Sequence, residues 1–291
     1  MELGLKGKRA LVFGGSRGMG RAIATQFARE GVHVTIAARN PETLARTAAE
    51  IEAATGMKVT HVSADITTEE GRKAALGAVL GGAGVAGEVR AGAGSGTGSG
   101  VGAGGGAIAS ESGPDILINN ADGPHPTGFQ ELTRDDWIGA FDSMMLGPIM
   151  MMRAVVDGMI ARRFGRIVNI SSRSVRTPQN EMPLSNGARS ALVGFVAGLS
   201  RQTVQHNVTI NNLLPGVFDS DAQINHIRGM LATSNKSFEQ LWEERGKSNP
   251  AGRYGRTEEI GALCAFLCSQ HAGYITGQNL LIDGGAYPGT L

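Results

Sequence analysis

Glycine makes up 44 of the 291 residues, about 15% against a usual share of about 7%, while hydrophobic residues reach 41% and charged residues 18%. This apolar fraction is ordinary for a globular protein and excludes a disordered chain, and glycine without a three-residue period excludes collagen. With 27 basic and 26 acidic residues the net charge is +1, so nothing indicates a nucleic-acid partner. No stretch approaches the roughly 18 uncharged apolar residues of a membrane helix, and the first residues lack the apolar core of a secretory signal, so we expect a cytoplasmic protein without a membrane partner.

Short apolar runs and helix-like segments alternate along the chain. The apolar runs predict strands over residues 10–13, 32–37, 58–62, 115–118, 166–170, 208–214 and 279–282. The segments between them predict helices over 19–29, from 41 onward, and over 67–80, 134–163, 185–206 and 257–268. This alternation predicts one α/β domain over residues 1–291, a Rossmann-type, doubly wound parallel sheet of about seven strands with helices on both faces.

Two stretches depart from the alternation. Residues 81–113 contain 14 of the glycines and nothing that could form a core, so we interpret them as a flexible surface insertion. Residues 217–249 have mixed helical character and lie beyond the carboxyl end of a predicted strand, which is where substrate lids are found. Cys264 and Cys268 are expected to be free buried thiols, and no metal site is predicted.

A glycine-rich turn lies directly between the first predicted strand and the first predicted helix, with the spacing G-x-x-x-G-x-G. Glycines there let the backbone turn sharply and approach a pyrophosphate, whose charge is stabilised by the helix N-terminus. Strand, turn and helix in this order predict dinucleotide binding, and the alternative is a tight turn that binds nothing. The predicted cofactor residues of this turn are Gly14, Ser16, Arg17, Gly18, Met19 and Gly20.

The end of the second predicted strand indicates which dinucleotide binds. An acidic residue there favours NAD(H), whereas a cation favours the 2′-phosphate of NADP(H). Here the strand runs into Arg39 and Asn40 without a carboxylate, and Arg17 in the glycine turn adds a second cation. The sequence therefore predicts NADP(H) rather than NAD(H), the alternative being that both arginines are ordinary surface residues.

Further motifs follow in a fixed order along nearly the whole chain. They are Asp65-Ile66, Asn119-Asn120-Ala121, Ile167 to Ser172, Pro215-Gly216 with Ser220, and Asp283-Gly284-Gly285. Together with the glycine turn, this set resembles the short-chain dehydrogenase/reductase family. The resemblance implies that Asp65 and Ile66 contact adenine, that Asn120 and Ala121 line the cofactor, and that Pro215, Gly216 and Ser220 contact the nicotinamide amide. It also implies a homodimer or homotetramer built on the two long helices, or a hetero-oligomer with an active homologue.

The catalytic positions of this family are matched only in part. The family uses a serine that orients the carbonyl, a tyrosine that acts as acid or base, a lysine that lowers the pKa of this tyrosine and holds the ribose, and an asparagine. Ser172 matches the serine, but Ser185 stands at the tyrosine position, Arg189 at the lysine position and Met144 at the asparagine position. An aliphatic hydroxyl cannot be tuned toward neutral pH without a partner base, and arginine cannot relay a proton. The usual proton path is therefore absent.

For other residues near the predicted site, the sequence leaves more than one role possible. Phe13 and Asp122 stand where the family has threonine and glycine, and either could obstruct the cofactor. His125, past the carboxyl end of the fourth strand, is of the type best suited to proton transfer at neutral pH, or it is a solvated loop residue. Ser185 is either catalytic or the N-cap of a helix that begins there. Arg189 is predicted both to act in catalysis and to bind the cofactor ribose.

Three functions are compatible with this sequence. The favoured one is an NADP(H)-dependent oxidoreductase with an atypical active site, acting on the carbonyl or alcohol group of a small molecule. The second is an inactive partner subunit or cofactor sensor, because tyrosine, lysine and asparagine are missing together. The third is non-redox chemistry on the same scaffold. Halohydrin dehalogenases also pair the serine with an arginine, but they keep the tyrosine and lack a full cofactor loop.

Overall fold

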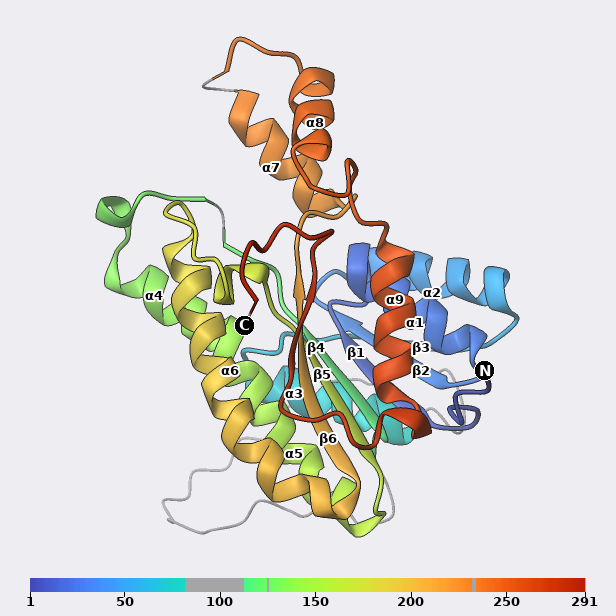
Figure 1. Ribbon diagram of the computed structural model, residues 1–291. Coiled ribbons are helices and arrows are strands. Elements are labelled where there is room, and N and C mark those ends of the chain that lie inside the picture. The colour runs from blue at the N-terminus through green and yellow to red at the C-terminus, as the bar shows by residue number, and fades with distance from the viewer. Residues whose placement is uncertain (82–112, 125, 232–233, 291) are drawn as a thin grey trace, which may run out of the picture.

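The computed structural model describes residues 1–81, 113–124, 126–231 and 234–290. Within them, seven strands form one sheet in the order β3-β2-β1-β4-β5-β6-β7, and all neighbours are parallel (Figure 1). The strands are β1 (Arg9–Phe13), β2 (His33–Ala38), β3 (Val59–Ser63), β4 (Ile116–Asn120), β5 (Gly165–Ile170), β6 (Val208–Pro215) and β7 (Asn279–Ile282). The predicted doubly wound parallel sheet is confirmed, and each predicted strand overlaps the observed one.

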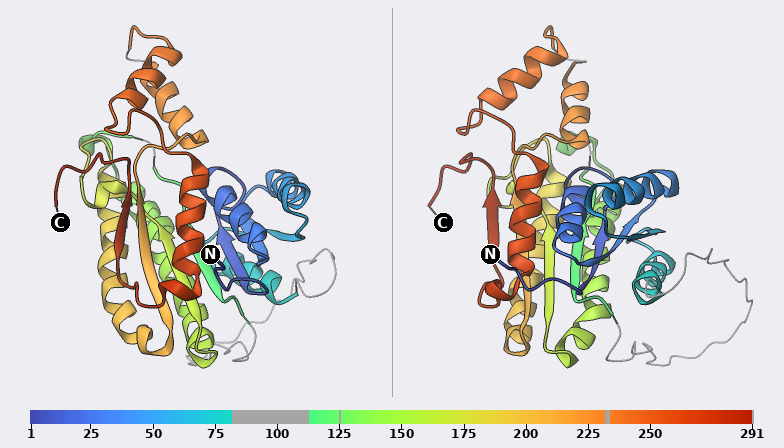
Figure 2. Two further views of the ribbon diagram at one scale, coloured as in Figure 1. Left: turned by 45° about the vertical axis from the view of Figure 1, so that its right-hand side comes forward. Right: turned by 90° about the vertical axis from the view of Figure 1, so that its right-hand side faces the viewer.

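Helices cover both faces of the sheet, as the edge-on view in Figure 2 shows. One face carries α1 (Gly18–Arg29), α2 (Pro41–Thr55) and α9 (Thr257–Cys268), whose apolar side chains share one core cluster with the sheet. The other face carries α3 (Glu69–Gly81), α5 (Gly147–Ala161) and α6 (Pro183–Thr203), which share a second cluster. α4 (Arg134–Phe141) packs beside α6. Both faces are therefore buried, as the apolar strand sequences require.

Of the two stretches that depart from the alternation, 81–113 and 217–249, the structure describes mainly the second. The stretch 217–249 contains α7 (Asp221–Leu231) and α8 (Phe238–Lys247), which stand beyond the carboxyl ends of the strands (Figure 1). Its mixed helical character is thus confirmed, while its role as a substrate lid stays a prediction. Residues 82–112 of the predicted glycine-rich insertion lie outside the described residues. Cys264 and Cys268 are free and buried, as predicted.

The helix predicted over 134–163 is divided in the structure. α4 ends at Phe141, a π-helical turn spans Asp142–Leu146, and α5 begins at Gly147. Pro148 has no backbone N–H to donate to the preceding turn, so the regular hydrogen-bond ladder cannot run through this point. The predicted helix is confirmed as one helical segment, Arg134–Ala161, but the π-helical turn within it was not predicted.

The segment Arg134–Ala161 is also unusually apolar. It contains an 18-residue window of mean hydropathy 1.4, long and apolar enough to cross a membrane by composition alone, and 44% of that window is buried inside the protein. Met151, Met152 and Met159 are fully buried against the sheet. Methionine fills irregular gaps well, so core packing accounts for the apolar composition of this face.

Four asparagine side chains form a hydrogen-bonded row across the sheet. The amide of Asn119 on β4 donates to Asn169 on β5 (2.9 Å), Asn169 donates to Asn212 on β6 (3.0 Å), and Asn212 donates to Asn279 on β7 (2.8 Å). These residues are also register partners in the sheet. Because a one-residue slip would leave buried amides without partners, the row fixes the register of these four strands.

Candidate cofactor site and active site

The glycine turn after β1 has no room for side chains at its closest points. Gly14 has a positive φ of 62°. A Cβ there would lie 2.6 Å from the backbone oxygen of Asn120 and 2.6 Å from its side-chain nitrogen Nδ2. A Cβ on Gly20 would lie 2.1 Å from the Gly14 carbonyl oxygen. The backbone carbonyl of Ser16 accepts a hydrogen bond from the Thr47 hydroxyl of α2 (2.8 Å), which fastens the turn from outside. The turn is thus held in the tight form that dinucleotide sites use.

The first helix presents an open N-terminus to this turn. Arg17 is the N-cap residue, and its side chain makes no capping hydrogen bond. The first turn of α1, which starts at Gly18, contains no acidic residue. Its leading N–H groups are therefore available to an anion, and the helix dipole favours negative charge there. These features fit the pyrophosphate of a dinucleotide.

A cavity of about 300 Å³ lies at the carboxyl ends of β2 and β3, lined among others by Arg39, Ser63 and Asp65. The Ser63 hydroxyl donates to the backbone carbonyl of Arg39 (2.9 Å). Partial burial acts to raise the pKa of Asp65, but hydrogen bonds from the Thr67 backbone and hydroxyl, with the nearby Arg39 charge, hold this pKa below its usual value. Asp65 is therefore an anionic acceptor at neutral pH, as recognition of an adenine amino group requires.

The segment after β6 approaches the glycine turn from the other side. A Cβ on Gly18 would lie 3.9 Å from the Ser220 Cβ. The Ser220 hydroxyl makes only long hydrogen bonds, 3.4 Å each, to the Phe218 carbonyl and from the Gln223 amide. Gly216 follows Pro215, the last residue of β6, and a Cβ on it would lie 2.7 Å from Asp283. The structure thus brings the predicted nicotinamide contacts beside the predicted pyrophosphate turn.

The candidate catalytic serines occupy different environments. Ser172 follows β5 and is half-buried, and its hydroxyl oxygen accepts the Ser174 backbone N–H (3.1 Å). Ser185 is only 2% exposed. Because α6 begins at Pro183 and its N-cap residue is Met182, Ser185 lies inside the first helical turn. The alternative that Ser185 is the N-cap is therefore wrong: proline, preorganised for the first turn, starts the helix earlier.

Arg189 is a buried cation, 7% exposed, at the position of the family lysine. It donates to the backbone carbonyl of Ile170 at the end of β5 (2.8 Å) and to that of Ala121 after β4 (3.1 Å). Within the described part of the chain, its Nε is buried without a hydrogen-bond partner. Burial lowers the pKa of Arg189 to about 10, although the charge of Asp122 acts to raise it. The guanidinium therefore stays charged at neutral pH.

The other residues singled out from the sequence lie in different surroundings. Phe13 packs in the core beneath α3 and α5, so its side chain points away from the cofactor path. Met144 is buried in a small cluster with Ala140, Leu184 and Ala188, where it supplies no hydrogen bond. Ile66 is buried and its backbone carbonyl accepts from Arg72 (2.8 Å). His125 lies outside the described residues.

Two titratable side chains that the sequence did not single out, His226 on α7 and Arg245 on α8, interact electrostatically with the segment between β5 and α6. Burial and the charge of Arg245 lower the pKa of His226 on α7, while Glu181 acts to raise it. Burial also lowers the pKa of Arg245 on α8, with Arg173 and Glu181 among the charges that act on it. Arg173 is the neighbour of Ser172 in the sequence. No spacing in the sequence links these four residues, because they come from three separate segments.

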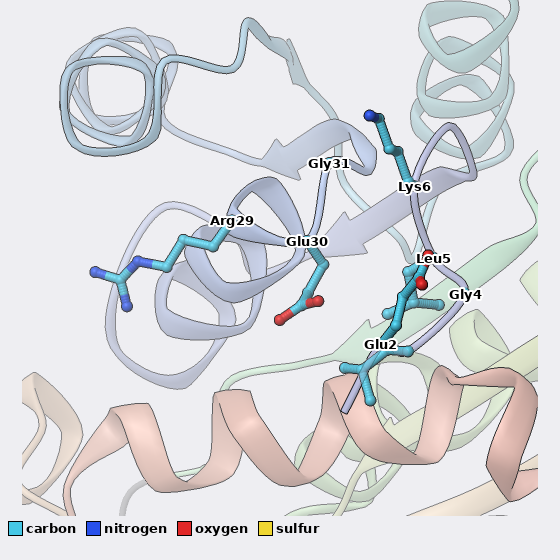
Figure 3. A pocket seen from close by; sticks show the side chains of 8 residues that line it. Glu2, Gly4, Leu5, Lys6, Arg29, Glu30 and Gly31 are labelled. Atoms are coloured by element: carbon cyan, nitrogen blue, oxygen red, sulfur yellow. The ribbon is translucent and has the colours of Figure 1, made fainter.

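A second cavity lies at the opposite end of the molecule. It has a volume of about 310 Å³ and is lined by the amino-terminal segment Glu2 to Lys6 and by Arg29 to Gly31 (Figure 3). The side chain of Arg29 extends away from the amino-terminal segment. Gly31 precedes β2, so this cavity opens at the amino ends of the strands, whereas ligands of open α/β sheets bind at the carboxyl ends.

Comparison with known proteins agrees with this arrangement. Residues 8–98 match the short chain dehydrogenase family, and residues 106–287 match the family described as enoyl-(acyl carrier protein) reductase. The chain belongs to the short-chain dehydrogenase/reductase family. Its relatives carry the names of reductases and dehydrogenases, so this is a family of oxidoreductases.

Individual relatives are similar over their full length. The chain is 29% identical to 3-oxoacyl-[acyl-carrier-protein] reductase of Aquifex aeolicus, over 99% of this chain and 100% of that protein. It is also 29% identical to gluconate 5-dehydrogenase of Gluconobacter oxydans, over 97% and 95% of the two chains. Among solved structures, L-sorbose reductase from Gluconobacter frateurii, complexed with NADPH and L-sorbose, superposes with a TM-score of 0.85 at 26% identity over both full chains.

Proposed function

We propose that this protein is an NADP(H)-dependent oxidoreductase that interconverts a carbonyl and an alcohol on a small molecule. The observation that carries the proposal is the intact dinucleotide cradle: an uncapped helix N-terminus behind a glycine turn, with the cation Arg39 where the adenosine ribose would lie. NADPH in the L-sorbose reductase complex supports the preference for NADP(H). The reductase and dehydrogenase names of the relatives support the reaction type.

The proposed division of roles uses the residues that are present. The nicotinamide supplies or accepts the hydride when it is bound. The Ser172 hydroxyl donates a hydrogen bond to the substrate carbonyl oxygen, and the Arg189 charge stabilises negative charge that develops on this oxygen. Arg189, at the position of the family lysine, is also proposed to bind the cofactor ribose. Ser185 completes the polar lining, and His125, after the carboxyl end of β4 in the sequence, is proposed as the proton carrier.

The direct test is NADPH binding followed by turnover over a panel of ketones, ketoses and oxo acids. We expect Ser172→Ala to lower kcat about 100-fold with little change in NADPH affinity, because it removes one donor to the developing oxyanion. His125→Ala should lower kcat and flatten its pH dependence. Ser190→Ala is the matched control, because Ser190 is exposed on the same helix as Arg189. Tight NADPH binding without turnover of any substrate would contradict the proposal.

A second function is favoured by one observation. Ser185 is 2% exposed and Met144 is buried, so two positions that carry catalytic groups in this family offer no accessible acid or base here. An inactive subunit that binds NADP(H) and assembles with an active homologue would have these features. Affinity purification from the native host distinguishes the two: the inactive-subunit function requires a co-purifying dehydrogenase, and measurable turnover by the protein alone excludes it.

A further inference from the structure

The residue that follows β2 is already engaged by a carboxylate. The guanidinium Nη2 of Arg39 lies 3.1 Å from Oδ2 of Asp122, and the two residues are separated by 83 positions in the sequence. Both side chains are well exposed, 70% for Arg39 and 80% for Asp122. Asp122 stands at the position where the family sequence has a glycine, so this ion pair belongs to the present chain and is not implied by the family pattern.

The strand order shows what this ion pair crosses. β2 and β4 are the two neighbours of β1 in the sheet. Arg39 follows β2 directly and Asp122 lies two residues beyond β4, so their ion pair passes over the carboxyl end of β1, where the glycine turn begins. A dinucleotide in a doubly wound fold lies across this same point. Its adenosine would occupy the cavity beside Arg39 and Asp65, and its pyrophosphate the turn from Gly14 to Gly20.

The same loop also reaches the candidate active site. A Cβ on Gly123 would lie 3.8 Å from the Arg189 Nη2, and the charge of Asp122 acts on this guanidinium. Asp122 therefore stands between two cations, one at the ribose end of the cofactor path and one at the catalytic end.

We propose that Asp122 is an internal competitor of the 2′-phosphate for Arg39 and thereby limits the preference of this protein for NADP(H) over NAD(H). This inference rests on the proposed dinucleotide function. In the free protein, Asp122 occupies the guanidinium that would hold the phosphate. NADP(H) binding must break this ion pair, and the 2′-phosphate then replaces the Asp122 carboxylate as a doubly charged partner of Arg39. NAD(H) has no 2′-phosphate to replace the carboxylate.

The test compares dissociation constants of NADPH and NADH by calorimetry for the wild type and Asp122→Asn. The substitution keeps the size of the side chain and removes its charge. An exposed ion pair contributes up to about 1 kcal/mol, so NADPH affinity should rise about threefold to fivefold. Removing the Asp122 charge also removes its repulsion of the pyrophosphate, which both dinucleotides contain. The ratio of the two dissociation constants is therefore the quantity that tests the competition. That ratio should shift toward NADPH.

Two further variants isolate the pairwise effect. In an Arg39→Ala background, Asp122→Asn should change NADPH and NADH affinity equally, because no guanidinium remains to be released. Asp135→Asn, on the exposed surface of α4, removes the same charge elsewhere and should leave the ratio unchanged. If the wild type binds NADPH and Asp122→Asn leaves the ratio unchanged, the competition is overturned while the proposed function stands. If neither protein binds either dinucleotide, both are overturned.

Discussion

The buried guanidinium of Arg189 lowers the stability of the folded protein, because its charge is removed from water. It lies 7% exposed, with two backbone carbonyls as hydrogen-bond acceptors and no ion pair to any carboxylate among the described residues. Desolvation, which lowers the pKa of Arg189 to about 10, is the physical sign of that cost. Because the folded pKa lies below the unfolded one, the charge destabilises the folded protein at all pH values below about 10. Such a residue is retained for what it binds.

We therefore expect Arg189→Met to stabilise the free protein and to impair its function. Methionine has a similar length and removes the desolvated charge, so the free energy of unfolding in urea should rise by about 1–2 kcal/mol. Turnover should fall at least 100-fold, because the developing negative charge on the substrate loses its cation. Arg201→Met, at the exposed end of the same helix, is the control and should change stability by less than about 0.5 kcal/mol. A less stable Arg189→Met protein would contradict this account.

At the scale of elements, the asparagine row explains how strands β4 to β7 are held in one register. Asn169 sits in the middle of the row and is 1% exposed, and both of its amide atoms are used. Asn119 and Asn169 both lie in motifs of the family, but no sequence pattern predicts a role for Asn212 and Asn279. Their common role depends on strand register, which brings together residues 43 to 67 positions apart.

The same limit applies to other elements of the site. The strands could be predicted because each is a short apolar run between polar residues, and the glycine turn because its spacing has a steric reason. The π-helical turn at Asp142–Leu146 was missed, because a widened hydrogen-bond ladder leaves no periodic pattern in the sequence. The ion pair of Arg39 and Asp122 was missed because strand order alone makes these residues neighbours.

Asn169→Leu should therefore destabilise the protein more than an ordinary buried substitution of equal size. It leaves the amide of Asn119 and the carbonyl oxygen of Asn212 buried without partners, at about 1–3 kcal/mol each. We expect a loss of about 2–4 kcal/mol in the free energy of unfolding, measured by urea denaturation. Asn279→Leu, at the half-buried end of the row on the edge strand, should cost less than half as much. Equal effects at the two positions would show that the row does not act as a network.

At the scale of the whole molecule, the layer of α4, α5 and α6 leaves an apolar surface uncovered. Ile138, Leu146 and Phe195 are each 39–40% exposed on this layer, although the inner sides of the same helices fill the core. Large exposed apolar side chains on neighbouring helices are typical of contacts between subunits. The proposed homodimer or homotetramer would bury this surface.

Phe195→Glu tests that assembly. A charge at the centre of an apolar contact must be desolvated when subunits meet, so the variant should be monomeric at micromolar concentration while the wild type is a dimer or tetramer, measured by light scattering after gel filtration. The wild-type melting temperature should rise with protein concentration, and that of the variant should not. Leu80→Glu, 36% exposed on α3, is the matched control and should keep the wild-type assembly. Leu146→Glu is the second variant, in case Phe195→Glu misfolds. A wild-type monomer, or variants that assemble normally, would show that this surface has another purpose.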